Sequence, residues 1–232
     1  MSKVMPYPTS TLKNLKQSLK NREDFLSFDF LGRSLAYNPY MPRAEIFDFK
    51  REQDIAGKIL FIESFDYEDI AGILDFGSDM IAIDFTSIYE KNIPSVDAFD
   101  CLTHLRRYTQ ALIIHNDIFL NQYQLLESAI YGSDCVVLDA GILGKELDMM
   151  CDFALRLSLV PIVKVASIEE LKRAIFAKVD IFYIIDDFSN LLSALPNSKI
   201  VLRDLPIGIQ SIDKKISYGV DKFLIKKDNW FD

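Results

Sequence analysis

The segment "ALIIHNDIFLNQYQL", residues 111–125, joins an apolar run to a polar cluster. Its first four residues are apolar, and His115, Asn116 and Asp117 follow directly, before a pattern with helical spacing begins. A short, continuous apolar run is typical of a parallel strand that is covered on both faces. Polar side chains where such a strand ends are typical of the rim at which α/β enzymes place their sites. The segment therefore predicts a β–α unit with a candidate site at the end of its strand.

The same alternation recurs along the chain from residue 44 onward. Short apolar runs that predict strands lie at 44–49, 80–84, 111–114, 135–139, 160–165, 181–185, 199–202 and 222–225. Longer amphipathic runs lie between them, and one begins with a capping box formed by Ser167 and Glu170. This order predicts an α/β fold, a (β/α)8 TIM barrel, with a doubly wound open sheet as the alternative.

Both ends of the chain depart from a standard barrel. Residues 1–43 predict an N-terminal helical extension, which leaves 44–232 for the barrel. After the last strand candidate only "KKDNWFD" remains, so the eighth helix is truncated or absent, although Trp230 and Phe231 could fill part of the gap. Because outer strand faces need a cover, we expect the extension to fold across the seam between the first and eighth strands. Coverage by a second subunit is the alternative, so the chain is expected to be a monomer or a homodimer.

A second apolar run is an alternative for the first strand. The run "KILFIES", residues 58–64, is as apolar as residues 44–49. We expect the earlier run to be the strand and the later one to belong to a long loop after it. On this interpretation Lys50 lies at the end of the first strand, where it would face the mouth of the barrel.

Composition excludes several classes of function. Half of the 232 residues are hydrophobic, which is enough for a sizeable core. The formal net charge of −8 argues against a general binder of nucleic acid or of anionic membranes. The three cysteines predict buried free thiols in a reducing compartment, so we expect a cytoplasmic protein. Neither a zinc-binding pattern nor a membrane-spanning run is found, and no cofactor is implied.

Several segments resemble, in order along the chain, the indole-3-glycerol phosphate synthase family of tryptophan biosynthesis. "IFDFKREQDIAGK" is similar to the family's "IAEIKRASPSKG", and "ALIIHNDIFLNQYQ" to "PVLCKDFIIDPYQ". The second segment keeps Asp117, Tyr123 and Gln124, and "YGVDKFLIKKDNW" is similar to "AGADAFLIGEALM". The resemblance covers nearly the whole chain. It implies a TIM barrel preceded by extra helices, and a phosphorylated substrate that undergoes ring closure and decarboxylation.

The resemblance also shows substitutions at the family's catalytic positions. Lys50 stands for the first-strand lysine that contacts phosphate and assists the chemistry, and Asp48 stands for a positioning glutamate. Asn116 stands at the general-acid lysine of the third strand, and Lys164 at the general-base glutamate of the fifth. An amide has no proton to exchange near neutral pH, and each acid or base contributes about 10²–10⁴-fold. Lys50 and Lys164 remain as candidate catalytic residues in a protein with weak or no synthase activity.

Phosphate binding is predicted to rely on side-chain charge. The family holds phosphate on backbone amides after the eighth strand, where this chain has Lys226 and Lys227. The seventh-strand serine–glycine pair is replaced by "RDLPI", which begins with Arg203. We expect Lys50, Arg203, Lys226 and Lys227 to bind a small phosphorylated ligand, with a solvated chain end as the alternative for the last two.

The remaining polar candidates have simpler interpretations. Alternation along the strand turns His115 away from Asn116, which indicates a structural histidine. Lys164 and Asp139 both end predicted strands, so they form either an ion pair that fills space or a new active pair. Adjacent Asp186 and Asp187 lack further spaced ligands, and a solvated loop is favoured over a metal site.

Three functions therefore remain open from the sequence. The first is a diverged synthase-family protein that retains a phosphate-binding pocket. The second is an active synthase in which Lys164 delivers protons from a different strand. The third is a non-catalytic interaction scaffold.

Overall fold

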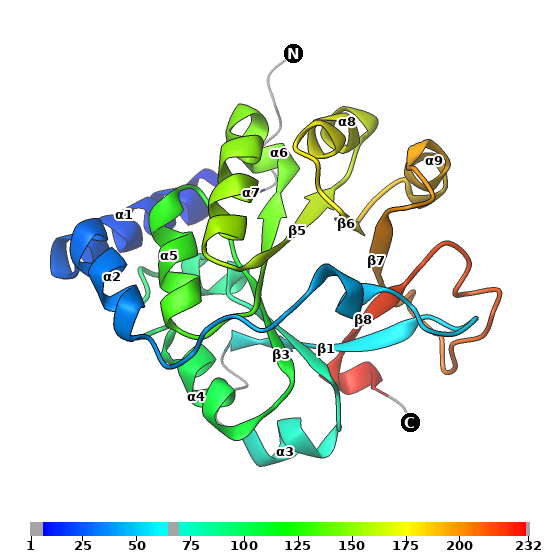
Figure 1. Ribbon diagram of the computed structural model, residues 1–232, viewed down its shortest axis with the longest axis horizontal. Coiled ribbons are helices and arrows are strands. Elements are labelled where there is room, and N and C mark those ends of the chain that lie inside the picture. Colours follow the sequence, from blue (N-terminus) through cyan, green and yellow to red (C-terminus); the bar gives the residue numbers. More distant parts are fainter. Residues whose placement is uncertain (1–6, 65–69, 231–232) are drawn as a thin grey trace.

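Eight parallel strands close into a barrel in the computed structural model, which describes residues 7–64 and 70–230 (Figure 1). The strands follow one another around the barrel in chain order, and β1 pairs with β8 to close it. They are β1 (Gly57–Glu63), β2 (Met80–Asp84), β3 (Leu112–Asn116), β4 (Cys135–Asp139), β5 (Val160–Val165), β6 (Ile181–Ile184), β7 (Ile200–Asp204) and β8 (Lys222–Lys226). The predicted TIM barrel is confirmed, and the open-sheet alternative is excluded.

Helices surround the barrel and precede it. They are α1 (Thr9–Phe25), α2 (Phe28–Ser34), α3 (Ile70–Asp75), α4 (Asp100–Tyr108), α5 (Gln122–Ile130), α6 (Ala140–Leu143), α7 (Leu147–Arg156), α8 (Ile168–Phe176) and α9 (Phe188–Ala194). Short 3-10 turns are η1 (Leu35–Tyr37), η2 (Ile46–Phe49), η4 (Thr86–Tyr89), η5 (Gly144–Glu146) and η6 (Lys227–Asn229). Ser167 caps α8 as predicted, because its side chain accepts a hydrogen bond from the backbone N–H of Glu170.

The predicted first strand at 44–49 is wrong. This segment forms η2, whereas the competing run forms β1 and pairs with both β2 and β8. The apolar character of the earlier run comes from packing, since Phe49 is fully buried in the barrel interior together with Ile59 and Met80. A short apolar run alone does not show whether a segment forms a strand or packs a side chain into the end of the barrel.

Alternate residues of each strand face the barrel interior. A single apolar cluster fills that space with inward side chains such as Ala82, Ile114 and Val137. On six of the eight strands, the next inward side chain two residues further along is polar: Asp84, Asn116, Asp139, Lys164, Asp204 and Lys226. The carboxyl end of the barrel, its mouth, therefore carries a polar layer above an apolar core.

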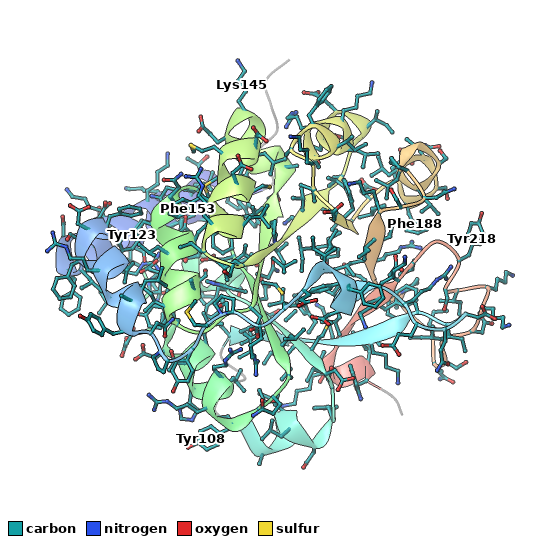
Figure 2. The ribbon with its side chains drawn as sticks, in the orientation of Figure 1. Tyr108, Tyr123, Lys145, Phe153, Phe188 and Tyr218 are labelled. Atoms are coloured by element: carbon teal, nitrogen blue, oxygen red, sulfur yellow. The ribbon has the colours of Figure 1, made fainter. Side chains whose placement is uncertain are left out.

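The seam between β8 and β1 is not covered by the N-terminal extension. Helices α1 and α2 lie at the opposite side of the barrel, against η4 and α5 (Figure 1). The outer side chains Phe223 and Ile225 of β8 pack instead against residues of the 205–218 segment and against Trp230. Figure 2 shows Tyr218 at the outer edge of that segment, where its side chain is exposed. The chain's own turns close the seam, and Phe231 lies outside the described residues.

A buried ion pair explains why α1 lies where it does. The Arg22 guanidinium contacts the Glu127 carboxylate of α5 at 2.8 Å, and the two side chains are only 3% and 6% exposed. Arg22 also lies 4.4 Å from the centre of the Phe99 ring. A second bond joins the Asn14 side chain to the Tyr89 carbonyl at 2.9 Å. These contacts fix α1 against the β2–β3 side of the barrel, away from the seam.

Removing one member of this pair should strongly destabilise the fold. We expect Arg22→Met to lower the free energy of unfolding by roughly 1–3 kcal/mol, because the buried Glu127 carboxyl, whose pKa burial raises to about 8, loses its hydrogen-bond partner. Urea denaturation measures the change. Replacing both members, Arg22→Met with Glu127→Leu, should recover much of the loss.

The matched control is Lys214→Met, which breaks an ion pair with Asp54 whose side chains are both 74% exposed. Exposed pairs contribute about 0–1 kcal/mol, so this variant should unfold close to the parent. An Arg22→Met protein as stable as the control would contradict the role given to the buried pair.

Candidate functional site

Lys164 and Asp139 form an ion pair at the mouth. The ammonium of Lys164 lies 2.9 Å from a carboxylate oxygen of Asp139, and the two side chains are 14% and 10% exposed. The hydroxyl of Tyr7 accepts a further hydrogen bond from Lys164 at 3.2 Å. Burial acts to lower the pKa of Lys164, but Asp139 and Tyr7 together raise it above its ordinary value. Lys164 is therefore a fixed ammonium whose charge is already matched.

The side chain of Asn116 is also hydrogen-bonded to a neighbouring residue. Its side-chain amide donates a hydrogen bond of 2.9 Å to Asp84, which also accepts from the hydroxyl and the backbone N–H of Thr86. Burial raises the pKa of Asp84. The position that the resemblance assigns to a general acid thus holds a carboxamide that orients a carboxylate.

The structure moves Lys50 away from the mouth. It follows η2 at the amino-terminal end of the barrel, where it lines a groove of about 740 Å³ with Lys199, Tyr218 and Asp221. The strand end that it was expected to occupy carries Glu63, which accepts a hydrogen bond of 3.3 Å from Ser87. The expected convergence of Lys50 with Arg203 and Lys226 is therefore not found. The cause is the shift of the first strand to 57–63.

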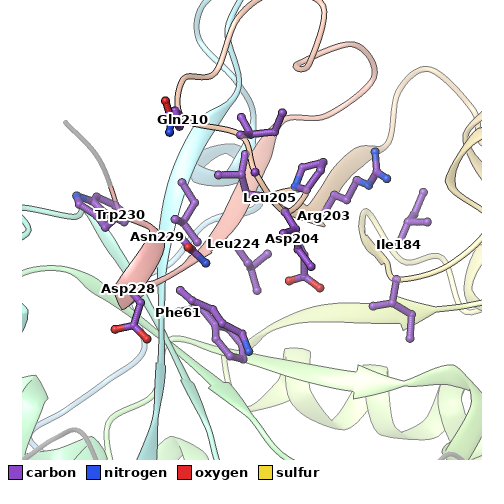
Figure 3. Close-up of a pocket in the computed structure, with 17 residues that line it drawn as sticks. Phe61, Ile184, Arg203, Asp204, Leu205, Gln210, Leu224, Asp228, Asn229 and Trp230 are labelled. Carbon is purple, nitrogen blue, oxygen red and sulfur yellow. The ribbon is translucent and has the colours of Figure 1, made fainter.

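A cavity of about 1050 Å³ opens at the carboxyl ends of β6, β7, β8 and β1 (Figure 3). Its walls combine apolar side chains with two cations and two carboxylates: Phe61, Ile184, Leu205, Leu224, Trp230, Arg203, Lys226, Asp204 and Asp228. The Arg203 guanidinium lies 4.2 Å from the centre of the Phe188 ring. Figure 3 shows the Arg203 side chain directed away from Phe61. Lys226 is exposed, and Lys227 begins η6 next to it.

His115 faces the outer side of the sheet, as alternation predicts. Its ring packs against Phe85, Phe99 and Phe119, and its Nδ1 lies 2.7 Å from the Ser128 hydroxyl. Burial, with a further contribution from Arg22, lowers the pKa of His115 to about 3. The ring is therefore neutral near pH 7, and its position is structural.

The two adjacent aspartates do not form a site. Asp186 and Asp187 are exposed, and Asp187 accepts a hydrogen bond from Asn190 at 2.7 Å. Within 7–64 and 70–230, no group of three or more His, Cys, Asp or Glu side chains is arranged to hold a metal ion. The cysteines Cys101, Cys135 and Cys151 are free and buried, as predicted.

Sequence reasoning missed several mouth residues. Asp84 and Asp204 end their strands in the same way as Asn116, so the polar strand-end signal could have found them. Asp204 accepts a hydrogen bond of 2.7 Å from the buried Tyr183 hydroxyl. Glu63 lies in the run that the sequence assigns to a loop, so its place at the end of a strand is not predicted. No sequence signal pointed to Tyr7, which reaches the mouth from outside the barrel.

A closed barrel of parallel strands with a polar layer and a cavity at their carboxyl ends defines the class of TIM-barrel enzymes and their relatives. Residues 97–186 match the family model described as indole-3-glycerol phosphate synthase. The indole-3-glycerol phosphate synthase of Campylobacter jejuni strain 81-176 is 32% identical to the chain, with 90% of this chain and 89% of the relative covered. That of Campylobacter curvus strain 525.92 is also 32% identical, over 92% and 90%. The chain belongs to the indole-3-glycerol phosphate synthase family.

Solved structures agree on the fold. A mutant tryptophan synthase alpha-subunit from the hyperthermophile Pyrococcus furiosus superimposes with a TM-score of 0.60 and 12% identity, covering 77% of this chain and 88% of that chain. At this identity the likeness concerns the fold alone. Among the described helices, none is both long and apolar enough to cross a membrane.

The neutral, buried state of His115 predicts an acid-sensitive fold. A histidine whose folded pKa is depressed contributes stability that is present above about pH 6.5 and is lost as the pH falls toward about 3. The loss approaches roughly 1.4 kcal/mol for each pH unit within that window. We expect His115→Gln, which cannot take up a proton, to unfold with a shallower pH dependence than the parent between about pH 6 and pH 4.

Thermal unfolding at several pH values measures this slope. Burial raises the pKa of Asp117 to about 6 and gives a contribution of opposite sign. Because an Asp117 carboxylate oxygen lies 3.7 Å from Nε2 of His115, both proteins are compared in the Asp117→Asn background. The control is His104→Gln, because His104 is exposed on α4. Identical slopes for the His115→Gln protein and the parent would show that this histidine does not titrate as described.

Proposed function

We propose that this chain is an indole-3-glycerol phosphate synthase-family protein with weak or no synthase activity, which binds a small phosphorylated ligand at the barrel mouth. The observation that carries the proposal is the pairing at the acid and base positions. Lys164 is held by Asp139 and Tyr7, and Asn116 is held by Asp84. The free, buried cysteines support a reducing, cytoplasmic setting.

The chemistry of the family requires groups that these positions do not supply. Ring closure needs a proton delivered to a ketone while its carbon is attacked, and the later steps need a further acid and a base. The amide of Asn116 cannot deliver that proton. The ammonium of Lys164 has no lone pair with which to accept one. At the end of β1 stands the carboxylate of Glu63 in place of a lysine.

Ligand binding is supported by the cavity and its cations. Arg203 and Lys226 line the wall formed by β7 and β8, and Lys227 follows. Asp204 and Asp228 line the same space and offset part of that charge. We therefore propose weak, salt-sensitive binding of a phosphate group near Lys226, with the remainder of the ligand against the apolar wall.

The second candidate is an active synthase in which Lys164 is the general acid. It is favoured by one observation, since Lys164 keeps its proton and faces the mouth beside a carboxylate. The two candidates differ in the effect of Lys164→Met. This change should abolish turnover if Lys164 is the acid, and should leave background activity unchanged if the protein is inactive.

We expect the purified protein to form indole-3-glycerol phosphate at least about 10⁴-fold more slowly than the Campylobacter jejuni relative, since two groups worth about 10²–10⁴-fold each are replaced. Product fluorescence in a steady-state assay measures the rate. Asn116→Lys with Lys164→Glu should raise the rate above the parent. Lys50→Ala should change nothing, because Lys50 lies at the opposite end of the barrel. Robust turnover by the parent that Lys164→Met removes would instead establish the second candidate.

We expect glycerol 3-phosphate to bind with a dissociation constant on the order of 1 mM at low ionic strength, and to bind more weakly as salt is added. Calorimetry on the parent, Lys226→Ala and Lys50→Ala tests the position of the site. Lys226→Ala should weaken binding several-fold, whereas Lys50→Ala should not, because Lys50 lines a different groove. Equal affinity in all three proteins would place the ligand elsewhere.

A further inference from the structure

Tyr7 is an aromatic side chain that reaches the mouth from outside the barrel. It lies two residues before α1, next to Pro8, whose φ of −55° is fixed by its ring. Its hydroxyl accepts the hydrogen bond from Lys164, and the Lys164 ammonium lies 5.5 Å from the centre of its ring. Tyr7 therefore meets Lys164 through its hydroxyl, as a hydrogen-bond acceptor.

The position of Tyr7 is fixed from two directions. Helix α1 behind it is anchored to the barrel by the Arg22–Glu127 pair and by the Asn14 bond to Tyr89. On its other side, the Tyr7 hydroxyl is hydrogen-bonded to the Lys164 ammonium, which is itself paired with Asp139. Burial raises the pKa of the Tyr7 phenol, so it is neutral at ordinary pH.

The residues of the mouth fall into two groups. The β4–β5 side, which holds Asp139 and Lys164, lies against Tyr7, and both of these side chains are largely covered. The open cavity is lined by β1, β6, β7, β8 and the segments that follow them. A ligand in that cavity meets Lys226, whereas Lys164 is not part of the cavity lining and is bonded to Asp139 and Tyr7.

We propose that Tyr7 is a positioning residue that covers the β4–β5 side of the mouth and holds Lys164 against Asp139. The inference rests on the proposed function, because it concerns the same mouth. It assigns the specificity of the mouth to the N-terminal segment: the native cavity takes a ligand on the β6–β1 side only. Without the phenol, the β4–β5 side accepts an aromatic acid, whose ring fills the vacated space and whose carboxylate meets Lys164.

The first test measures access to Lys164 directly. The folded proteins are treated briefly with acetic anhydride, and acetylation of each lysine is followed by mass spectrometry. Loss of a hydrogen bond to a charged group corresponds to about tenfold or more, so Tyr7→Ala should acetylate Lys164 at least about tenfold faster than the parent. Tyr7→Phe keeps the ring and should fall between the two.

Lys199 is the internal reference, because it is partly covered and paired with Asp180 at 2.8 Å, far from Tyr7 at the amino end of β7. Its rate should be the same in all three proteins. Equal acetylation of Lys164 in parent and Tyr7→Ala overturns the proposal. If Tyr7→Ala proves unfolded by circular dichroism, Tyr7→Phe decides: a rate for Lys164 equal to the parent's overturns the proposal, and a faster rate supports it.

The second test asks what the vacated space binds. Benzoate and neutral benzyl alcohol are titrated into the parent, Tyr7→Ala and Tyr7→Ala/Lys164→Met, and binding is followed by NMR. Benzoate should bind at least about tenfold more tightly to Tyr7→Ala than to the parent, by the same charge-assisted contact. The affinity for benzyl alcohol should rise less on Tyr7→Ala, and adding Lys164→Met should remove the increase in benzoate affinity. Benzoate binding that is unchanged by Tyr7→Ala or by Lys164→Met contradicts the assignment.

These outcomes are distinguishable from failure of the proposed function. If the parent proves to be an active synthase, acetylation of Lys164 still reports whether Tyr7 covers it. If the parent is inactive and Lys164 is equally reactive in every variant, only the role of Tyr7 is lost.

Discussion

Closure of the barrel restricts where this chain can place polar side chains. Both faces of every strand are covered, by the interior cluster on one side and by helices or turns on the other. A polar group within a strand must therefore find a buried partner, as His115 does in Ser128, or lie at the end of its strand. The polar layer of the mouth follows from this constraint. Chemistry in such a fold is decided by which residue ends each strand.

The strand ends of this chain satisfy one another. Lys164 matches Asp139 across the β4–β5 register, Asn116 matches Asp84 across β2–β3, and Tyr183 donates to Asp204. Pairing of this kind lowers the cost of burying the groups, but it also engages the atoms that a substrate would need. The family's fold is thus retained, and the weak or absent activity that we propose rests on these internal contacts among the strand-end groups.

Seven of the strand runs, the Ser167 cap and the outward turn of His115 could be predicted from the sequence, because each rests on a local pattern. The first strand could not. Residues 46–49 are apolar because Phe49 plugs the amino end of the barrel, and a run of that length fits either role. Because of this error, the sequence places Lys50 at the carboxyl end of the barrel, although it lies at the amino end. For the same reason Glu63 is not predicted to be a strand-end residue. The cover of the seam was also missed, since the 205–218 segment carries no helical period that would mark its packing on β8.

Tyr7 could not be found from any local pattern, because its role depends on a contact made 15 residues away. The buried Arg22 fixes α1 on the barrel, and α1 in turn fixes the chain that precedes it. With a rise of about 1.5 Å per residue, the part of α1 from Arg22 back to Thr9 carries this constraint over roughly 20 Å. The side chain that meets Lys164 is therefore held by the Arg22–Glu127 contact, which is buried on the outer side of the sheet. The extension, expected to close a seam, instead sets the shape of the mouth.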